Sequence, residues 1–198
     1  MKISNNSLKI NGDIIEKYFF DIERMKREKY FYLTFKNKNL NIPKIVNIKK
    51  NKIFFKKYKF KSIKSQKLFF DELLIFVIKL NKYKKYNLRA KENLHSYRDL
   101  LNQVKKRFKK ISNITVEKKS AAKLKIIKKY IKKILNESPL SAKLARCKKM
   151  ISQSDVGFHN CGTVNGKVFF YDFEYAGYDH PIKLICDAYY QPEMRIHK

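Results

Sequence analysis

Two carboxylates and one amide near the end of the sequence have the types and spacing that phosphoryl transfer needs. Asp155 is followed five positions later by Asn160, and Asp172 follows an apolar run further along the chain. Transfer of a phosphoryl group to a hydroxyl needs a carboxylate that orients the hydroxyl and takes its proton, and oxygen ligands that hold magnesium against the phosphates. Asp155 can be that base, and Asn160 and Asp172 can be the magnesium ligands.

A two-stranded ribbon would bring these residues together, because a hairpin signal separates Asn160 from Asp172. The dipeptide NG at 165–166 stands just before the apolar run 168–171, and this dipeptide is a strong indicator of a tight hairpin turn. The pattern predicts a ribbon over residues 161–171 that folds Asp172 back beside Asn160. Asp and Asn are also common turn formers, but the place of Asp172 directly after an apolar strand favours the functional interpretation.

Three segments of the chain resemble one family of enzymes. Residues 154–160 (SDVGFHN) resemble the catalytic loop of the aminoglycoside phosphotransferase and choline-kinase-like family, in the branch with Ser before the Asp. Residues 172–175 (DFEY) resemble its metal-binding segment, and residues 179–187 (DHPIKLICD) resemble the Asp-x-Pro…Asp pattern that follows. Residues 97–111 are also similar to a helix that these enzymes carry before the catalytic loop, so the resemblance covers most of the chain.

The resemblance implies a fold, a reaction and a set of site residues. The implied fold is an α+β, protein-kinase-like two-lobed fold, with a small N-terminal antiparallel sheet plus a helix and a mainly helical C-terminal lobe that carries a catalytic β-hairpin. Residues 1–62 would form an incomplete N-terminal nucleotide-binding lobe, and residues 63–198 would form the catalytic lobe. The implied cofactors are ATP and Mg²⁺, with Asp155 as base, Asn160 and Asp172 as magnesium ligands, and Asp187 as a brace for the catalytic loop.

The amino-terminal half contains a candidate for the lysine that reaches the ATP phosphates. Lys17 lies late in a predicted strand and resembles that lysine, and Glu28, on the helix predicted next, resembles its ion-pair partner. Glu23 competes for the same role. In a chain with 40 lysines the alternative is an ordinary surface Lys beside a surface Glu. The succession of strand and helix favours the functional interpretation. Glu174 remains open between a metal ligand and a solvent-facing side chain.

Hydrophobic patterning predicts the elements that position these residues. The first sixty residues indicate strand, strand, helix, strand, strand, with a hairpin signal NG at 11–12. The middle of the chain indicates helices whose apolar residues recur at steps of three and four, typical of core helices of a bundle. The predicted strands span residues 8–10, 14–20, 45–48 and 53–58, and the predicted helices span residues 21–37, 68–80, 97–111, 121–134 and 182–190.

Two features depart from the family pattern. The phosphate-covering loop of a kinase is usually rich in glycine, whereas residues 4–7 (SNNS) stand in that place here. Family members also continue with helices that shape the acceptor pocket, and this sequence stops eleven residues after Asp187. We therefore expect a chain truncated at both ends. A kinase-like scaffold without activity is the alternative to an active kinase.

The formal net charge of +30 has two interpretations. A basic protein can bind a nucleic acid through its phosphates. However, the basic residues are 40 Lys and only 7 Arg, and Lys, Asn, Ile, Phe and Tyr, all abundant here, share A/T-rich codons. Nucleic-acid readers rely on Arg for bidentate contacts. Codon usage is the better interpretation, and we expect a small molecule with a hydroxyl, such as a sugar, an amino sugar or a choline-like alcohol, as the acceptor.

The three cysteines and four histidines do not have the spacing of a zinc site. The odd number of cysteines indicates a reducing compartment. The sequence shows no signal peptide, and its longest apolar run, Leu73 to Ile78, is too short to span a bilayer. We therefore expect a cytoplasmic protein without a membrane span, whose oligomeric state the sequence does not indicate.

Overall fold

A computed structural model describes residues 6–83, 86–91, 97–112, 125–130, 132–133 and 147–190. The chain forms two compact units, the first from Met1–Asn93 with Lys149–Lys198 and the second from Leu94–Lys148. All predicted site residues belong to the first unit. The predicted lobe boundary after residue 62 would fall within the first unit and stays a prediction.

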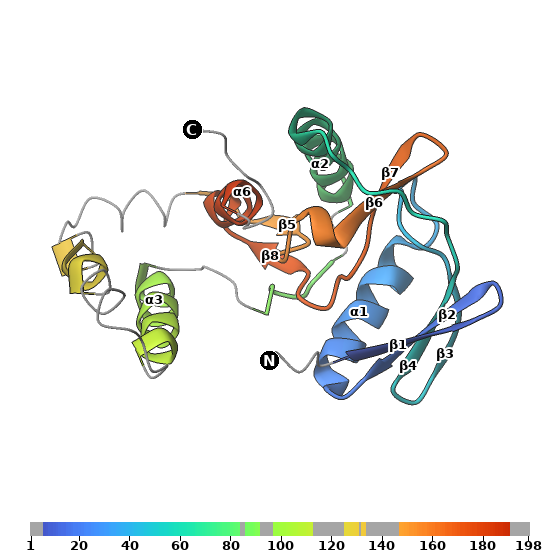
Figure 1. Cartoon of the computed structure of the whole chain (residues 1–198), viewed down its shortest axis with the longest axis horizontal. Helices are drawn as coiled ribbons and strands as arrows, with labels where there is room; N and C mark the ends of the chain where they lie inside the picture. The colour runs from blue at the N-terminus through green and yellow to red at the C-terminus, as the bar shows by residue number, and fades with distance from the viewer. Residues whose placement is uncertain are drawn as a thin grey trace. The chain divides into compact units, whose positions relative to one another are not determined.

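An antiparallel sheet of four strands forms the amino-terminal part of the first unit, in the order β1-β2-β4-β3 (Figure 1). The hairpin predicted at Asn11-Gly12 joins the first two strands, with Asn11 paired to Ile14. A second hairpin joins the other two strands, which match those predicted over residues 45–48 and 53–58. The strands are β1 (Asn6–Asn11), β2 (Ile14–Phe19), β3 (Ile45–Lys49) and β4 (Lys52–Lys56).

Helix α1 (Ile22–Phe35) follows β2 and lies against the sheet (Figure 1). It begins where Asp21 caps it, because the Asp21 carboxylate accepts hydrogen bonds from the backbone N–H groups of Glu23 and Arg24 at 2.9 and 3.3 Å. Its buried face carries apolar and aromatic residues together with one carboxylate, that of Glu28. The predicted helix over 21–37 is therefore confirmed to within two residues at its end.

The other described residues of the first unit form two α-helices, one short 3₁₀ helix and two small sheets. The β6–β7 ribbon turns at Asn165-Gly166, whose φ angles are +50° and +75°. Two successive positive φ values are what a type I′ hairpin turn requires, and Asn and Gly tolerate them best. The elements are α2 (Gln66–Asn81), β5 (Met150–Ser152), the short 3₁₀ helix η1 (Phe158–Asn160), β6 (Cys161–Val164), β7 (Lys167–Phe170), β8 (Gly177–Asp179) and α6 (Pro181–Tyr189).

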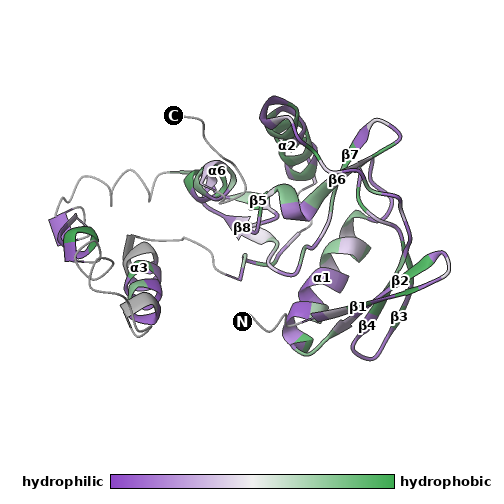
Figure 2. Ribbon diagram, in the orientation of Figure 1, coloured by the Kyte–Doolittle hydropathy of each residue, from purple (hydrophilic) through white to green (hydrophobic). Residues whose placement is uncertain are grey.

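Aromatic rings form the core of the first unit and connect α1 to the segment that follows β7. Phe173 stacks on Phe31 of α1 with ring centroids 3.9 Å apart, and Phe76 of α2 lies 4.6 Å from Phe170. All four rings are buried. Figure 2 shows mixed hydropathy along α1, as expected for a helix with one face in the core. Because Phe173 directly follows Asp172, this packing fixes the backbone that carries a predicted site residue.

The second unit contributes the helix α3 (Tyr97–Ser112) and a helical segment at 125–130 and 132–133. Both match helices predicted from apolar periodicity. Val104 and Phe108 of the predicted face are half-buried, whereas Ile127 is 47% exposed. The other side chains of the two predicted faces lie outside the described residues. None of the described helices is long and apolar enough to cross a membrane.

Candidate active site

Lys17 and Glu28 form a buried ion pair between β2 and α1. The Lys17 Nζ lies 2.6 Å from Glu28 Oε2, and the two residues are 6% and 1% exposed. The competing candidate, Glu23, instead pairs with Lys26 on the surface of the helix. The structure therefore brings Lys17 together with Glu28, which shares the buried face of α1 with the aromatic core.

Asp172 is the second residue whose carboxylate forms an ion pair with Lys17. Its Oδ1 lies 2.9 Å from Lys17 Nζ, and its side chain keeps 33% of its surface exposed. The backbone of Asp172 has a φ of +65°, in the left-handed region that few residues other than glycine adopt. Asp is among the residues that tolerate this conformation. This bend comes at the end of the hairpin, between the buried rings of Phe170 and Phe173.

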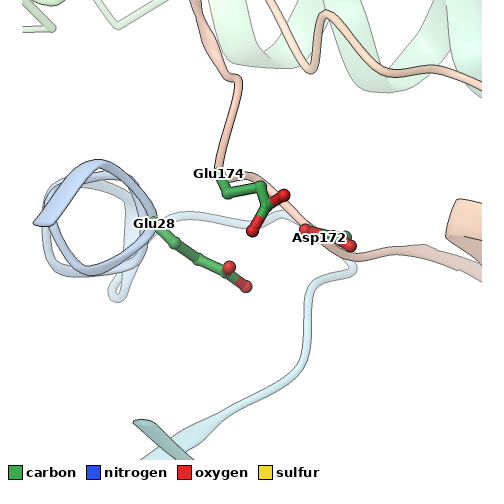
Figure 3. Close-up of side chains that lie close together, drawn as sticks. All are labelled: Glu28, Asp172 and Glu174. Carbon is green, nitrogen blue, oxygen red and sulfur yellow. The ribbon is translucent and has the colours of Figure 1, made fainter. Parts of the chain in front are cut away.

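Glu174 is buried and completes a group of three carboxylates (Figure 3). Its Oε1 accepts a hydrogen bond from Arg24 of α1 at 2.8 Å, and its Oε2 accepts one from the Asn6 side chain at 2.6 Å. Lys17 Nζ is 3.9 Å away. Glu174 is thus not solvent-facing. Arg24 and Asn6 were not predicted as site residues, although the four-residue spacing of Arg24 and Glu28 places these two residues on one side of α1.

The carboxylates of Glu28, Asp172 and Glu174 approach one another within 4.8 Å, and the cation among them is the Lys17 ammonium. Burial alone would lower the pKa of Lys17. The three carboxylates have the larger combined effect and raise this pKa well above its ordinary value. Burial raises the pKa of Glu28 to about 7, against the opposing effect of Lys17 and with an added contribution from Asp172 and Glu174. Three carboxylates are therefore in contact with only two cationic side chains, those of Lys17 and Arg24.

The loop after β5 carries Asp155 and Asn160 and is closed on itself. The Asn160 side-chain N–H donates to the backbone carbonyl of Asp155 at 2.9 Å, and the Asn160 backbone N–H donates to the carbonyl of Gly157 at 3.1 Å. The backbone N–H of Tyr171 donates to the carbonyl of Asn160 at 3.0 Å. This last bond places the residue before Asp172 directly against Asn160, so the ribbon returns the chain as predicted.

Asp155 is poised as an ionised and partly exposed carboxylate. The neighbouring His159 side chain lowers the pKa of Asp155, against the effect of partial burial, and the Asn160 amide and Lys183 add to the lowering. His159 Nε2 lies 3.7 Å from Asp155 Oδ1, and the Asp155 side chain is 46% exposed. The arrangement keeps Asp155 charged and accessible at neutral pH. His159 therefore lies beside Asp155 and favours its ionised form.

A cavity of about 400 Å³ opens where the sheet, α1 and the hairpin meet. This volume lies within the range of small-molecule sites. One side of it is apolar and aromatic, with Leu8, Ile15 and Phe55 among its residues, and the other side carries polar groups. Of the predicted site residues, four line it, and Asp155 does not: the four are Lys17, Glu28, Asn160 and Asp172.

The donor atoms of Asn160 and Asp172 fit a magnesium ion. Asn160 uses its side-chain N–H toward the Asp155 carbonyl, which leaves its Oδ1 as the atom available for a cation. Asp172 presents a partly exposed carboxylate to the same cavity. Amide and carboxylate oxygens are the hard ligands that Mg²⁺ prefers, and Mg²⁺ in nucleotide sites commonly takes only one or two protein groups.

This fold is the one found in kinases that act on small molecules: solved structures of aminoglycoside phosphotransferases and of choline/ethanolamine kinase family proteins share it. The gentamicin complex of APH(2'')-IIa has a TM-score of 0.60 at 17% identity, covering 90% of this chain and 64% of that chain. The ADP-bound APH(2'')-Ib gives 0.58 at 19% identity, covering 94% and 71%. The choline/ethanolamine kinase family protein from Mesorhizobium loti gives 0.59 at 11% identity, covering 93% and 60%.

These likenesses confirm the predicted kinase-like α+β fold and the structural resemblance to this group of enzymes. The chain spans less than two thirds of the length of the first of these structures. No protein-family model and no curated protein matches the sequence.

Proposed function

We propose that this protein is a phosphotransferase of the aminoglycoside phosphotransferase and choline-kinase-like group that moves a phosphoryl group from Mg²⁺-bound ATP to a hydroxyl of a small molecule. The observation that carries the proposal is the contact of one buried lysine, Lys17, with both Glu28 and Asp172, in a cavity that Asn160 also lines. Similar solved structures include APH(2'')-IIa with streptomycin and ATP and a mutant of APH(4)-Ia with ADP and hygromycin B, which supports a nucleotide and a hydroxylated acceptor.

Each predicted residue has a role in this proposal. Lys17 binds the phosphates of ATP and is held in place by Glu28. Asp155 orients the acceptor hydroxyl and takes its proton as the hydroxyl oxygen bonds to the terminal phosphorus of ATP. The bond from that phosphorus to the bridging oxygen breaks, and ADP leaves. Asn160 and Asp172 would hold Mg²⁺, which when bound would supply positive charge against the phosphate oxygens. The apolar side of the cavity accommodates the adenine ring.

Asp172→Asn tests the nucleotide and metal site, because Asn also tolerates a positive φ and the variant removes only the charge. We expect Mg²⁺-ATP to stabilise the native protein by about 2.7 kcal/mol at 100 times its dissociation constant, and the stabilisation to be largely lost in Asp172→Asn. The measurement is thermal unfolding with and without millimolar Mg²⁺-ATP. Asp71→Asn, an exposed change on α2, is the matched control and should behave like the native protein.

Asp155→Asn tests the chemistry separately from binding. Loss of a general base commonly lowers turnover by about 10²–10⁴, so we expect a fall of that size in ATP consumption with the nucleotide-induced stabilisation unchanged. Near-normal consumption in this variant would refute the role of Asp155. If the native protein shows no stabilisation by nucleotide, the catalytically inactive kinase-like scaffold becomes the better description.

A further inference from the structure

A second buried lysine, Lys183 of α6, is bonded to the loop that carries Asp155. Lys183 is 6% exposed, and its Nζ donates to the Ser154 backbone carbonyl at 3.3 Å and to the Ser154 Oγ at 3.0 Å. The same ammonium lies 2.5 Å from Asp187 Oδ2 and 3.3 Å from Asp179 Oδ2. One cation therefore connects α6, the end of β8 and the residue directly before Asp155.

The backbone at Ser154 needs such support. Its φ is +70°, a left-handed conformation that costs a residue with a side chain of the order of 1–2 kcal/mol. Strained residues of this kind persist only where their surroundings hold them. At Ser154 the surroundings include Lys183 on two atoms and Asp179, which accepts a hydrogen bond from the Ser154 Oγ at 3.2 Å. The direction in which the chain enters Asp155 is set at this residue.

Lys183 is 6% exposed and does not line the cavity, whereas the side chain of Asp155 is 46% exposed. Lys183 is therefore not itself placed to meet a ligand. Asp187, expected as a brace for the catalytic loop, reaches the loop through the Lys183 ammonium. Asp155 is thus held from two sides. Asn160 binds its carbonyl, and Lys183 binds the residue before it.

We infer that Lys183 is a positioning residue, whose ammonium holds the left-handed turn at Ser154 and thereby aims the Asp155 carboxylate at the acceptor hydroxyl. The catalytic part of this inference rests on the proposed function, while the support of the loop does not. Misplacing a catalytic group by about 1 Å can cost about 10²-fold in rate. Removal of Lys183 should therefore lower turnover and leave nucleotide binding, which uses Lys17 and Asp172, intact.

The test must avoid leaving a bare charge in the core. Asp179 is 1% exposed, and removal of one partner of a buried ion pair is strongly destabilising. We therefore compare Asp179→Asn with the double variant Asp179→Asn/Lys183→Met. The amide introduced by Asp179→Asn keeps an oxygen for Ser154, and the two proteins differ only in the Lys183 ammonium. Lys167→Met, on the exposed end of β7, controls for loss of a lysine in general.

Three measurements are made on each protein: the free energy of unfolding in urea, the hydrogen exchange of the backbone amides of residues 153–157, and the hydrolysis of Mg²⁺-ATP, with water in place of the acceptor. We expect the double variant to exchange these amides at least tenfold faster than Asp179→Asn. We also expect its kcat to be about 10²-fold lower, with the KM for ATP within about twofold.

Equal loop exchange in the two proteins at matched stability would overturn the inference, as would equal kcat or a loss that appears in KM for ATP. If the native protein neither binds nor hydrolyses Mg²⁺-ATP, the proposed function fails. The exchange comparison then decides alone whether Lys183 holds the loop.

Discussion

Glu28, Asp172 and Glu174 place three negative charges around the two positive charges of Lys17 and Arg24. A buried group with one excess negative charge favours uptake of a proton. Burial raises the pKa of Glu28 to about 7, and the charges of Asp172 and Glu174 add to this increase. The proton belongs to the group as a whole, because its members interact strongly. The same excess of negative charge suits a site that receives a divalent cation.

The raised pKa of Glu28 makes a prediction about stability. The folded protein holds a proton up to about pH 7, whereas the unfolded chain releases it near the ordinary value of 4.5. The free energy of unfolding should therefore fall as pH rises from 4.5 to 7, by up to about 3 kcal/mol. Glu28→Gln has no carboxyl group to titrate at this position, so its stability should not fall for this reason. Its free energy of unfolding relative to that of the native protein should therefore rise between pH 4.5 and pH 7. Urea unfolding from pH 4 to pH 8 measures the difference.

Glu23→Gln is the control for that series, because Glu23 lies on the same helix with a side chain 65% exposed. Its stability should stay parallel to that of the native protein at every pH. Should the curve for Glu28→Gln also run parallel, the pKa of Glu28 is not raised by burial.

At the residue scale, the sequence could predict contacts that follow from chain order. The return of the hairpin to Asn160 needed only two adjacent strands and one turn. The pairing of Lys17 with Glu28 was implied by the family resemblance together with the succession of strand and helix, and chain order alone did not separate Glu28 from Glu23. The burial of Glu174 could not be predicted in this way. It depends on Arg24 and Asn6, which lie 150 and 168 residues away in the sequence and meet Glu174 only in the folded protein.

At the scale of elements, β8 packs so closely against a neighbouring backbone segment that there is no room for a side chain at Gly177. It pairs with β5 on one side and meets Arg89 on the other, through the bridge from Arg89 to Tyr178. A Cβ at Gly177 would lie 2.3 Å from the Ala90 nitrogen and 2.4 Å from the Arg89 carbonyl carbon. These are backbone atoms, which cannot rotate away as a side chain can.

Gly177→Ala should therefore destabilise the protein by roughly 1–3 kcal/mol or more, the cost of overpacking a core. The matched change is Gly166→Ala, where no atom lies within 4 Å of the added Cβ and only the φ of +75° is unfavourable. That strain costs of the order of 1–2 kcal/mol. Urea unfolding of both variants should rank Gly177→Ala as the less stable. The reverse order would mean that β8 can move away from Arg89 and Ala90.

Sequence patterns predicted the elements well where a local signal was strong. The two Asn-Gly turns and the helix predicted over residues 68–80 each depend on a few neighbouring residues. The close approach at Gly177 was not predicted, because it depends on residues 89 and 90, far earlier in the chain. Close packing between distant segments leaves no local pattern in a sequence.

At the scale of the molecule, positive charge is denser in the second unit. Residues 94–148 contain 17 Lys or Arg and 3 Asp or Glu, a net charge of +14 in 55 residues out of +30 for the whole chain. A net charge of this size produces a positive potential around a protein. Such a field favours an anionic ligand such as ATP and opposes a polycationic acceptor, so fold likeness to enzymes crystallised with gentamicin is a weak guide to the acceptor.

The field leads to a prediction about salt. Because the Debye length falls from about 10 Å at 0.1 M to about 3 Å at 1 M, the affinity for Mg²⁺-ATP should fall several-fold between about 0.05 and 0.5 M salt. Adenosine, which lacks phosphates, is the matched ligand and should show little change. Titration calorimetry at the two salt concentrations measures both. An equal salt dependence for the two ligands would show that the positive charge takes no part in nucleotide binding and is a consequence of codon usage alone.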